Sequence, residues 1–197
     1  MTLISAAVLL FLVMDPLGNV PMFISTLKNV PPSRQNIVII RELLIALLLL
    51  VFFLFLGQYV LSWFHITDSA LTVSGGIILF LIALRMVFPS TEKPLQEQIE
   101  GEPFIVPLAV PYVVGPSAIA TVMLMMSQNP ASWPEGLAAV GLAWLASSLI
   151  LFFATKLQRW ISPRMLVAME RLMGMLLVTL AVQMLMSGIS QFMQHGL

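Results

Sequence analysis

The amino-acid sequence predicts an all-α, polytopic membrane protein, and its composition is the first reason. Hydrophobic residues make up 59% of the 197 residues and charged residues only 9%, whereas a soluble domain carries about 25% charged residues. The mean hydropathy is +1.01, and a soluble domain of this length has too much surface to hide that much apolar area. The absence of cysteine excludes a disulfide scaffold and a cysteine nucleophile. The formal net charge of zero gives no electrostatic basis for nucleic-acid binding.

The second reason is the distribution of apolar residues. Runs of about 20 residues, long enough to cross a hydrocarbon core of ~30 Å, occur six times. They are Leu3–Leu27, Glu42–Phe64, Ala70–Phe88, Ile105–Ser127, Gly136–Thr155 and Val167–Met193. We expect interfacial turns before the second and sixth spans. Ser33 and Ser162 are each adjacent to a proline, and serine at the N-cap and proline in the first turn are signals of a helix start. No basic residue precedes the first span, so we expect it to be permanent rather than a cleaved signal peptide.

The basic residues predict the orientation of these spans. All nine fall in the first, third and fifth connections or their flanks: Lys28, Arg34, Arg41, Arg85, Lys93, Lys156, Arg159, Arg164 and Arg171. Cytoplasmic loops carry an excess of lysine and arginine, so we expect both termini to be periplasmic. The long polar stretch 89–104 is expected to be a cytoplasmic linker between two halves, residues 1–88 and 105–197.

The two halves resemble each other at a nearly constant spacing. Gly76 and Gly174 are 98 residues apart and open matching apolar stretches, while Gly18 and Gly115 are 97 apart in spans one and four. Each half holds three spans, an odd number, so the second half must be inverted relative to the first. Inverted repeats build several secondary-transporter folds, in which substrate binds near the midplane where broken helices meet. We therefore expect two inverted three-helix repeats.

The first and fourth spans each contain a cluster of helix-interrupting residues near the middle. Proline removes a backbone donor, and a break inside lipid is tolerated only where protein or a water-filled cavity meets the freed groups. Half-helix ends present N–H groups that suit a carboxylate, and a charged residue at this depth is by default a functional candidate. The candidate binding residues are Asp15, Gly18, Asn19, Gly115, Pro116 and Ser117, and the candidate hinges are Pro16, Pro21 and Pro111.

A structural interpretation of the same residues stays open. Asp15 and Pro16 form a good N-cap and first-turn pair, so Asp15 would then only cap a kinked helix. Small residues on the third and sixth spans favour close helix packing over ligand binding; these are Gly75, Gly76 and Gly174. Two neighbouring pairs of opposite charge, Arg41–Glu42 and Glu170–Arg171, are interpreted as interfacial anchors.

Several motifs resemble one family. They are Asp15-Pro-Leu-Gly-Asn19, Gly115-Pro116-Ser117, Glu102-Pro-Phe-Ile-Val-Pro-Leu-Ala-Val-Pro111 and Glu170-Arg-Leu-Met-Gly174. The sequence resembles the MarC family of bacterial inner-membrane proteins nearly end to end. The resemblance implies a six-span protein related to small-solute exporters, some of which are described as transporters of small neutral amino acids. Many relatives carry Gly-Pro-Gly in the second motif, where Ser117 here adds a hydroxyl group.

We therefore expect an inner-membrane secondary transporter, an exporter of a neutral amino acid or a similar zwitterion, with no cofactor or metal. The half-helix ends at Gly18–Asn19 and Gly115–Pro116 would hold the carboxylate, and Asp15 would attract the ammonium group or carry a coupling proton. An intramembrane enzyme lacks a catalytic set, because both histidines lie outside the spans. A non-transporting structural or regulatory membrane protein is the main alternative, and a homo-oligomer is compatible with the sequence.

The charge distribution makes a direct prediction about topology. A reporter that is active only in the cytoplasm, fused after Leu197, should be silent, because the positive-inside rule places both termini outside the cytoplasm. The measurement is reporter activity at matched membrane abundance. A bright signal there would overturn the six-span topology.

Overall fold

The computed structural model describes residues 2–27, 30–88, 103–105, 108–128, 132–157 and 162–195. Most of these residues are helical. In chain order the elements are α1 (Leu3–Met14), α2 (Pro16–Leu27), α3 (Pro32–Trp63), α4 (Asp68–Val87), the π-helical segment η2 (Leu108–Val113), α5 (Pro116–Gln128), α6 (Trp133–Leu157) and α7 (Pro163–His195). The expected linker 89–104 lies almost entirely outside the described residues.

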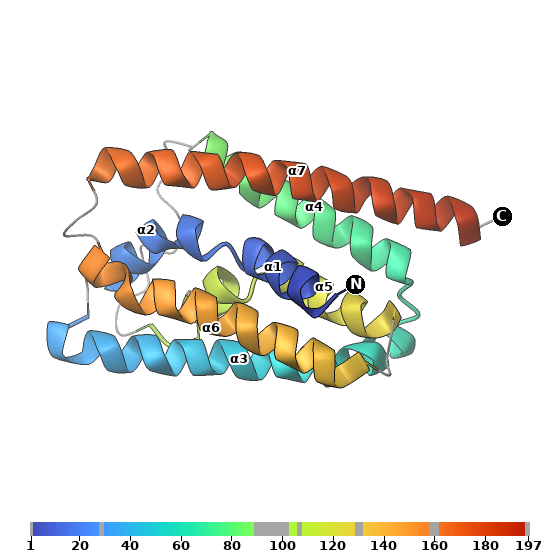
Figure 1. Ribbon diagram of the computed structural model, residues 1–197, viewed down its shortest axis with the longest axis horizontal. Coiled ribbons are helices and arrows are strands. Elements are labelled where there is room, and N and C mark those ends of the chain that lie inside the picture. Colours follow the sequence, from blue (N-terminus) through green and yellow to red (C-terminus); the bar gives the residue numbers. More distant parts are fainter. Residues whose placement is uncertain are drawn as a thin grey trace.

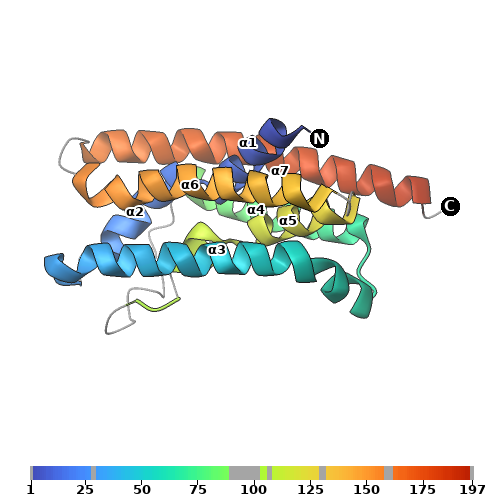
Figure 2. The ribbon, with the colours of Figure 1, turned by 60° about the horizontal axis from the view of Figure 1, so that its bottom comes forward.

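The helices form an elongated bundle in which long helices enclose short ones (Figure 1). The long helices α4 and α7 pack together on one side, and α3 and α6 lie together on the other. The short helices α1, α2 and α5 lie between these two pairs, so that α1 contacts α6 while α5 contacts both α3 and α4. The view turned by 60° shows the same arrangement (Figure 2). The junction of α1 with α2 is thus in the interior of the bundle, whereas Ile4 and Val8 near the start of α1 are exposed.

Five described segments are long and apolar enough to cross a bilayer. They are Leu3–Leu27, Pro32–Trp63, Asp68–Val87, Trp133–Ala154 and Val167–Gln194. These match the expected spans one, two, three, five and six. The expected fourth span, Ile105–Ser127, is not one continuous helix, because it is divided between η2 and α5. The chain is therefore a multi-pass helical membrane protein whose fourth apolar segment is built from short pieces.

The start of α3 corrects an expectation about the second span. No separate interfacial turn precedes it, because α3 runs without a break for 32 residues from Pro32. Ser33 is not its N-cap: Pro31 holds that position and makes no side-chain capping bond. A helix of 32 residues spans about 48 Å at 1.5 Å per residue, so α3 extends well beyond a hydrocarbon core.

The start of α7 corrects the same expectation for the sixth span and confirms its cap. Helix α7 is continuous from Pro163 over 33 residues, so the interfacial turn is absent there too. The hydroxyl of Ser162 accepts a hydrogen bond from the backbone N–H of Met165 at 3.3 Å. Ser162 is therefore the N-cap that the sequence predicts.

The outer surface of the bundle is apolar, as a lipid-facing surface must be. Large hydrophobic side chains are exposed along the outward sides of the long helices, among them Leu48 on α3, Leu81 on α4, Leu145 on α6 and Leu172 on α7. In a soluble monomer a continuous apolar surface of this kind is rare. The helices are hydrophobic all round because one side packs inward and the other contacts lipid.

The contact between α4 and α7 is made through glycines. A Cβ atom added to Gly76 would lie 3.2 Å from the carbonyl oxygen of Ala181 and 3.1 Å from Cγ of Leu185. Such distances leave almost no room for a larger side chain, so the two backbones approach closely at this point. The interpretation of Gly76 as a close-packing residue is confirmed.

Gly174 makes the reciprocal contact from the other helix. A Cβ atom there would lie 3.1 Å from the carbonyl oxygen of Ala83 and 2.9 Å from Cγ2 of Val87. The partners of Gly174, Ala83 and Val87, precede the partners of Gly76, Ala181 and Leu185, by 98 residues. Gly76 precedes Gly174 by the same number. Helices α4 and α7 are therefore antiparallel and meet through equivalent residues, as two units related by a two-fold axis do.

Helix α1 begins and α7 ends in the same half of the bundle, and α7 reaches further along it (Figure 1). The arginines near the starts of α3 and α7 lie at the opposite end, and these include Arg34, Arg41, Arg164 and Arg171. The described basic residues are thus separated from the termini along the bundle axis. Which end faces the cytoplasm stays a prediction of the charge distribution.

The glycine contacts predict a stability difference between glycines. Gly174→Ala should destabilise the protein by about 1–3 kcal/mol, the usual cost of overpacking, because its methyl group meets backbone and Cβ atoms of α4. Gly141→Ala on α6 is the matched control, since a methyl group there meets nothing within 4 Å. It should be neutral or stabilising, because alanine favours a helix over glycine by about 1 kcal/mol. Thermal unfolding in detergent measures both, and equal effects would contradict the close contact.

Candidate functional site

The first helix break is at Asp15, in the middle of the apolar segment Leu3–Leu27. Asp15 has left-handed backbone angles (φ 44°, ψ 59°), which end α1. Its backbone N–H donates to the carbonyl oxygens of Phe11 and Leu12, both at 3.1 Å. Pro16 then opens α2, as proline does at a first helical position. The break expected over Asp15–Asn19 is therefore present but shorter: it takes Asp15 alone, and Gly18 and Asn19 lie inside α2.

The side chain of Asp15 caps the second half of the broken helix. Its Oδ1 accepts a hydrogen bond from the Gly18 N–H at 3.1 Å, and its carbonyl oxygen accepts one from the Asn19 N–H at 3.1 Å. The Gly18 and Asn19 amides in the first turn of α2 are thus already bonded within the chain. Asp15 is 5% exposed, and among the described residues its second carboxylate oxygen, Oδ2, accepts no hydrogen bond. The capping role left open by the sequence is present, and one oxygen remains for another partner.

Glycine is needed at position 18 because the Asp15 carboxylate and the Met86 side chain lie directly against the α2 backbone there. A Cβ atom there would overlap Oδ2 of Asp15 and the methyl group of Met86, which reaches in from α4. The carboxylate therefore folds back over the α2 backbone, where only glycine leaves space for it. Gly18 itself lies within the regular helix α2.

The second break lies between η2 and α5. Val110 has extended backbone angles (φ −126°, ψ 127°) inside η2. The residue before a proline is pushed away from helical angles, so Pro111 explains the irregular backbone at Val110. After Val114 the chain turns at Gly115, whose carbonyl oxygen accepts the Ala118 N–H at 3.0 Å and the Ile119 N–H at 3.1 Å. Helix α5 therefore starts at Pro116, as the Gly-Pro-Ser motif predicts.

Asn19 joins the two breaks. Its side-chain amide nitrogen donates to the carbonyl oxygen of Met14 at 3.0 Å and to that of Tyr112 at 2.6 Å. Met14 is the last residue of α1, and Tyr112 lies next to the end of η2. The carbonyls that end a helix have no partner within it, so one amide satisfies a freed carbonyl from each break. Residues 93 apart in the chain are brought together in this way.

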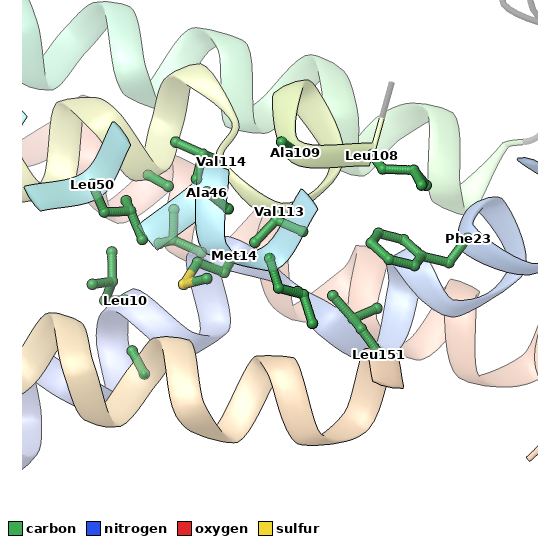
Figure 3. Packing of buried hydrophobic residues seen from close by; sticks show 14 of the residues in the cluster. Leu10, Met14, Phe23, Ala46, Leu50, Leu108, Ala109, Val113, Val114 and Leu151 are labelled. Carbon is green, nitrogen blue, oxygen red and sulfur yellow. The ribbon is translucent and has the colours of Figure 1, made fainter. Parts of the chain in front are cut away.

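Apolar side chains surround this junction. Met14, Val113 and Val114 are buried beside Ala46 and Leu50 of α3 (Figure 3). The ring of Tyr112 lies 6.4 Å from that of Phe23, centroid to centroid. The two freed carbonyls are thus partly buried among apolar side chains that offer no other donor, which raises the cost of leaving either carbonyl unpaired.

The start of α5 has an open amide and a buried hydroxyl group. By helix geometry the Ser117 N–H has no partner within α5, and Gly115 at the capping position has no side chain to supply one. Ser117 is 2% exposed, and among the described residues its hydroxyl makes no hydrogen bond. Thr121, one turn further on, is also buried and donates to the Ser117 carbonyl oxygen at 2.8 Å. Pro116, in contrast, is exposed.

Pro21 is not a hinge. It lies inside α2, which continues through it to Leu27. A proline removes one helical hydrogen bond, and transmembrane helices tolerate this where neighbouring groups compensate. The break in this segment is therefore at Asp15 alone, and the hinge expected at Pro21 is wrong.

The burial of one acidic residue is not predicted by the sequence. Glu42 was interpreted as part of an interfacial anchor, but it is fully buried (0% exposed) and pairs with Arg41 at 2.9 Å. The packing of distant helices determines this burial, and the local sequence carries no signal for it.

These observations define a polytopic α-helical membrane protein whose interior holds two interrupted helices joined at their breaks. The chain belongs to a family described as MarC family integral membrane protein, which it matches over residues 1–193. The resemblance noted in the sequence is therefore confirmed.

Curated relatives cover nearly the whole chain. It is 46% identical to the UPF0056 inner membrane protein YhgN of Escherichia coli (strain K12) over 98% of both chains. It is 41% identical to a UPF0056 membrane protein of Buchnera aphidicola subsp. Schizaphis graminum, again over 98% of both. A UPF0056 membrane protein of Chlamydia muridarum is 32% identical over 99% of this chain and 96% of its own. No solved structure matches the chain significantly.

The junction predicts a large effect of removing the Asn19 amide. Asn19→Leu keeps a similar size but leaves the Met14 and Tyr112 carbonyls unpaired, at a cost of about 1–3 kcal/mol for each. Gln35→Leu is the matched control, because the Gln35 amide also donates to two carbonyls, those of Leu27 and Val30, both at 3.1 Å. Both sites are partly buried, but Gln35 lies in the first turn of α3 at the end of the bundle, where interfacial water can replace the lost donor.

The measurement is thermal unfolding of both variants in the same detergent. We expect Asn19→Leu to lower the melting temperature several degrees more than Gln35→Leu does. Equal losses would show that Asn19 is an ordinary partly buried amide and not the link between the breaks.

Proposed function

We propose that the protein is a secondary transporter, an exporter, of a small neutral amino acid or a similar zwitterionic solute across the inner membrane. The observation that carries this proposal is the pair of open polar groups at the joined breaks. Asp15 offers a free carboxylate oxygen on one side, and the start of α5 offers an amide and the Ser117 hydroxyl on the other. A buried site with unfilled hydrogen-bonding capacity of both signs fits a ligand that carries both an ammonium and a carboxylate group.

The carboxylate of the solute is assigned to the start of α5. The N-terminus of a helix favours an anion, because its N–H groups point outward and its dipole is positive there. The start of α2 is less suitable, because the Asp15 carboxylate already lies against its first turn and would repel a second anion there. The ammonium group is assigned to Oδ2 of Asp15. In the absence of solute, a coupling proton on Asp15 serves the same electrostatic purpose.

The proposed transport cycle uses two inverted three-helix repeats. In this proposal α1 to α4 form one repeat, and η2 to α7 form the other. Each repeat begins with its interrupted helix. The reciprocal contacts of Gly76 and Gly174 support the arrangement, because equivalent residues meet across one antiparallel pair. Rocking of one repeat against the other around the fixed α4–α7 contact then exposes the breaks to each side in turn.

A non-transporting structural or regulatory membrane protein is the second candidate. The observation that favours it is that Asp15 does cap α2, so the break has a structural explanation that needs no solute. Purified protein in liposomes separates the two candidates. Uptake or efflux of radiolabelled neutral amino acids should exceed that of protein-free liposomes, while acidic and basic amino acids serve as chemical controls. No flux with any zwitterionic solute would favour the structural role.

The proposal predicts that the charge of Asp15 matters beyond capping. Asp15→Asn keeps the capping oxygen and the shape, so folding should survive while transport falls sharply. Asp15→Ala should also lose transport and should in addition lose about 1 kcal/mol of stability, the usual cost of a lost cap. Transport by both variants is measured at matched membrane abundance over a range of pH. Full activity of Asp15→Asn with the wild-type pH profile would mean that Asp15 is only a cap.

A further inference from the structure

Besides its central break, the fourth apolar segment is tied to the first half of the chain near both of its ends. At one end Arg41 of α3 donates from Nη2 to the carbonyl oxygen of Pro103. The same guanidinium group lies over the ring of Phe104, 5.0 Å from its centroid. Both contacts hold the chain just before η2, where the fourth segment enters the bundle.

Glu42 fixes the position of the Arg41 guanidinium. Its Oε1 accepts a hydrogen bond from Nε of Arg41 at 3.0 Å and lies 2.9 Å from Nη2. Glu42 is fully buried, and its Oε2 has no hydrogen-bond partner among the described residues. A buried carboxylate is costly unless it is paired, so the ion pair with Arg41 offsets the cost of burying Glu42. The pair therefore fixes the guanidinium group in the direction of Pro103.

The backbone next to this contact is strained. Ile105 has a φ of 62°, a left-handed conformation that is an outlier for a β-branched residue. Its carbonyl oxygen accepts the Val110 N–H at 2.9 Å, which starts the wide turn of η2. Strained residues persist where their surroundings hold them and often lie at switch regions.

At the other end Asp68 holds the end of α5. Its Oδ2 accepts a hydrogen bond from the hydroxyl of Ser127, in the last turn of that helix. Asp68 is the first residue of α4, which Thr67 caps through the Ala70 N–H at 3.2 Å. The α5 end is thus fixed to the rigid start of a long helix.

We propose that Arg41 with Glu42 and Asp68 with Ser127 are the two gates of the transport site. They lie at opposite ends of the bundle, because α3 and α4 are consecutive antiparallel helices and the two acid-bearing contacts lie near the start of each. Their partners in the fourth segment, Pro103 and Ser127, flank Gly115 in the chain, so the break and its open polar groups lie between the two contacts. Both contacts are closed in this structure, which is therefore an occluded state. The inference rests on the proposed transport function and names its positioning residues.

Opening one gate at a time would give each side of the membrane access in turn. Release of Pro103 by Arg41 opens the arginine-bearing end, which the charge distribution predicts to be cytoplasmic. Release of Ser127 by Asp68 opens the other end. Neither gate touches the solute, so variants of these residues should change access to the breaks without removing the Asp15 and Ser117 groups.

Thiol accessibility tests the gates, since the chain has no cysteine of its own. Ser117→Cys places one thiol at a position that is 2% exposed, between the two gates. Membrane-impermeant maleimide is added to vesicles of each orientation that carry this single-cysteine protein. The parent should label slowly from both sides. Adding Arg41→Gln should raise labelling several-fold from the arginine-bearing side only, and adding Asp68→Asn should raise it from the opposite side only.

Matched controls remove a charge at the same end without removing a gate contact. Arg85→Gln, on the exposed last turn of α4, is the control for Arg41→Gln, and the exposed Glu135→Gln on α6 is the control for Asp68→Asn. Both should label as the parent does. Two milder variants guard against misfolding. Phe104→Leu removes the exposed ring under Arg41, and Ser127→Ala removes the donor to Asp68; each should reproduce the side-specific increase of its own gate.

The outcomes separate this inference from the proposed function. Unchanged labelling in all four gate variants, or an equal increase from both sides, would overturn the gates. Side-specific increases with no solute flux in liposomes would support the gates and refute transport of the tested solutes. Flux without side-specific labelling would support the transporter and refute these gates.

Discussion

The interior of this protein depends on a single side-chain amide that satisfies two broken helices. Each break frees backbone carbonyls in an apolar bundle, where an unpaired group costs about 1–3 kcal/mol. Asn19 donates to Met14 at the end of α1 and to Tyr112 near the end of η2. The two interruptions are therefore stable only side by side. Asp15 meets the remaining requirement of the first break, because it ends α1 with its N–H and caps α2 with its carboxylate.

The long helices supply the frame around this junction. Helices α4 and α7 approach closely through Gly76 and Gly174, and the equivalent contacts on the two helices form one reciprocal interface. Between that pair and the pair α3–α6, the breaks are enclosed by protein, while the start of α1 is exposed, with Ile4 72% accessible. This enclosure is what permits non-helical backbone at this depth. The outer sides of the same long helices carry the exposed apolar residues that contact the bilayer.

The sequence predicts the parts of this structure that depend on local pattern. Apolar runs mark the long helices, and Asp15-Pro16 and Gly115-Pro116 mark both breaks, because proline and left-handed turns act on the adjacent backbone. Pro21 shows the limit of that reasoning: one proline in a helix that neighbours support does not break it. The irregular backbone of η2, before the second break, is not predicted, because hydropathy measures composition and not backbone continuity.

What the sequence does not predict depends on contacts between distant segments. The bond from Asn19 to Tyr112 uses a backbone carbonyl, which carries no residue-type signal. The burial of Glu42 likewise follows from which helices and loops cover it, and the pair Arg41–Glu42 has the same local appearance at an interface as in an interior. Thr121 is buried beside Ser117 because of the direction in which α5 leaves the break.

An experimental map of the protein in a lipid nanodisc tests the central claim most directly, at a resolution that shows the Asn19 side chain. The account predicts two interrupted helices side by side, with the Asn19 amide between the carbonyls of Met14 and Tyr112. A continuous helix through Asp15, or an Asn19 side chain directed away from the second break, would contradict it.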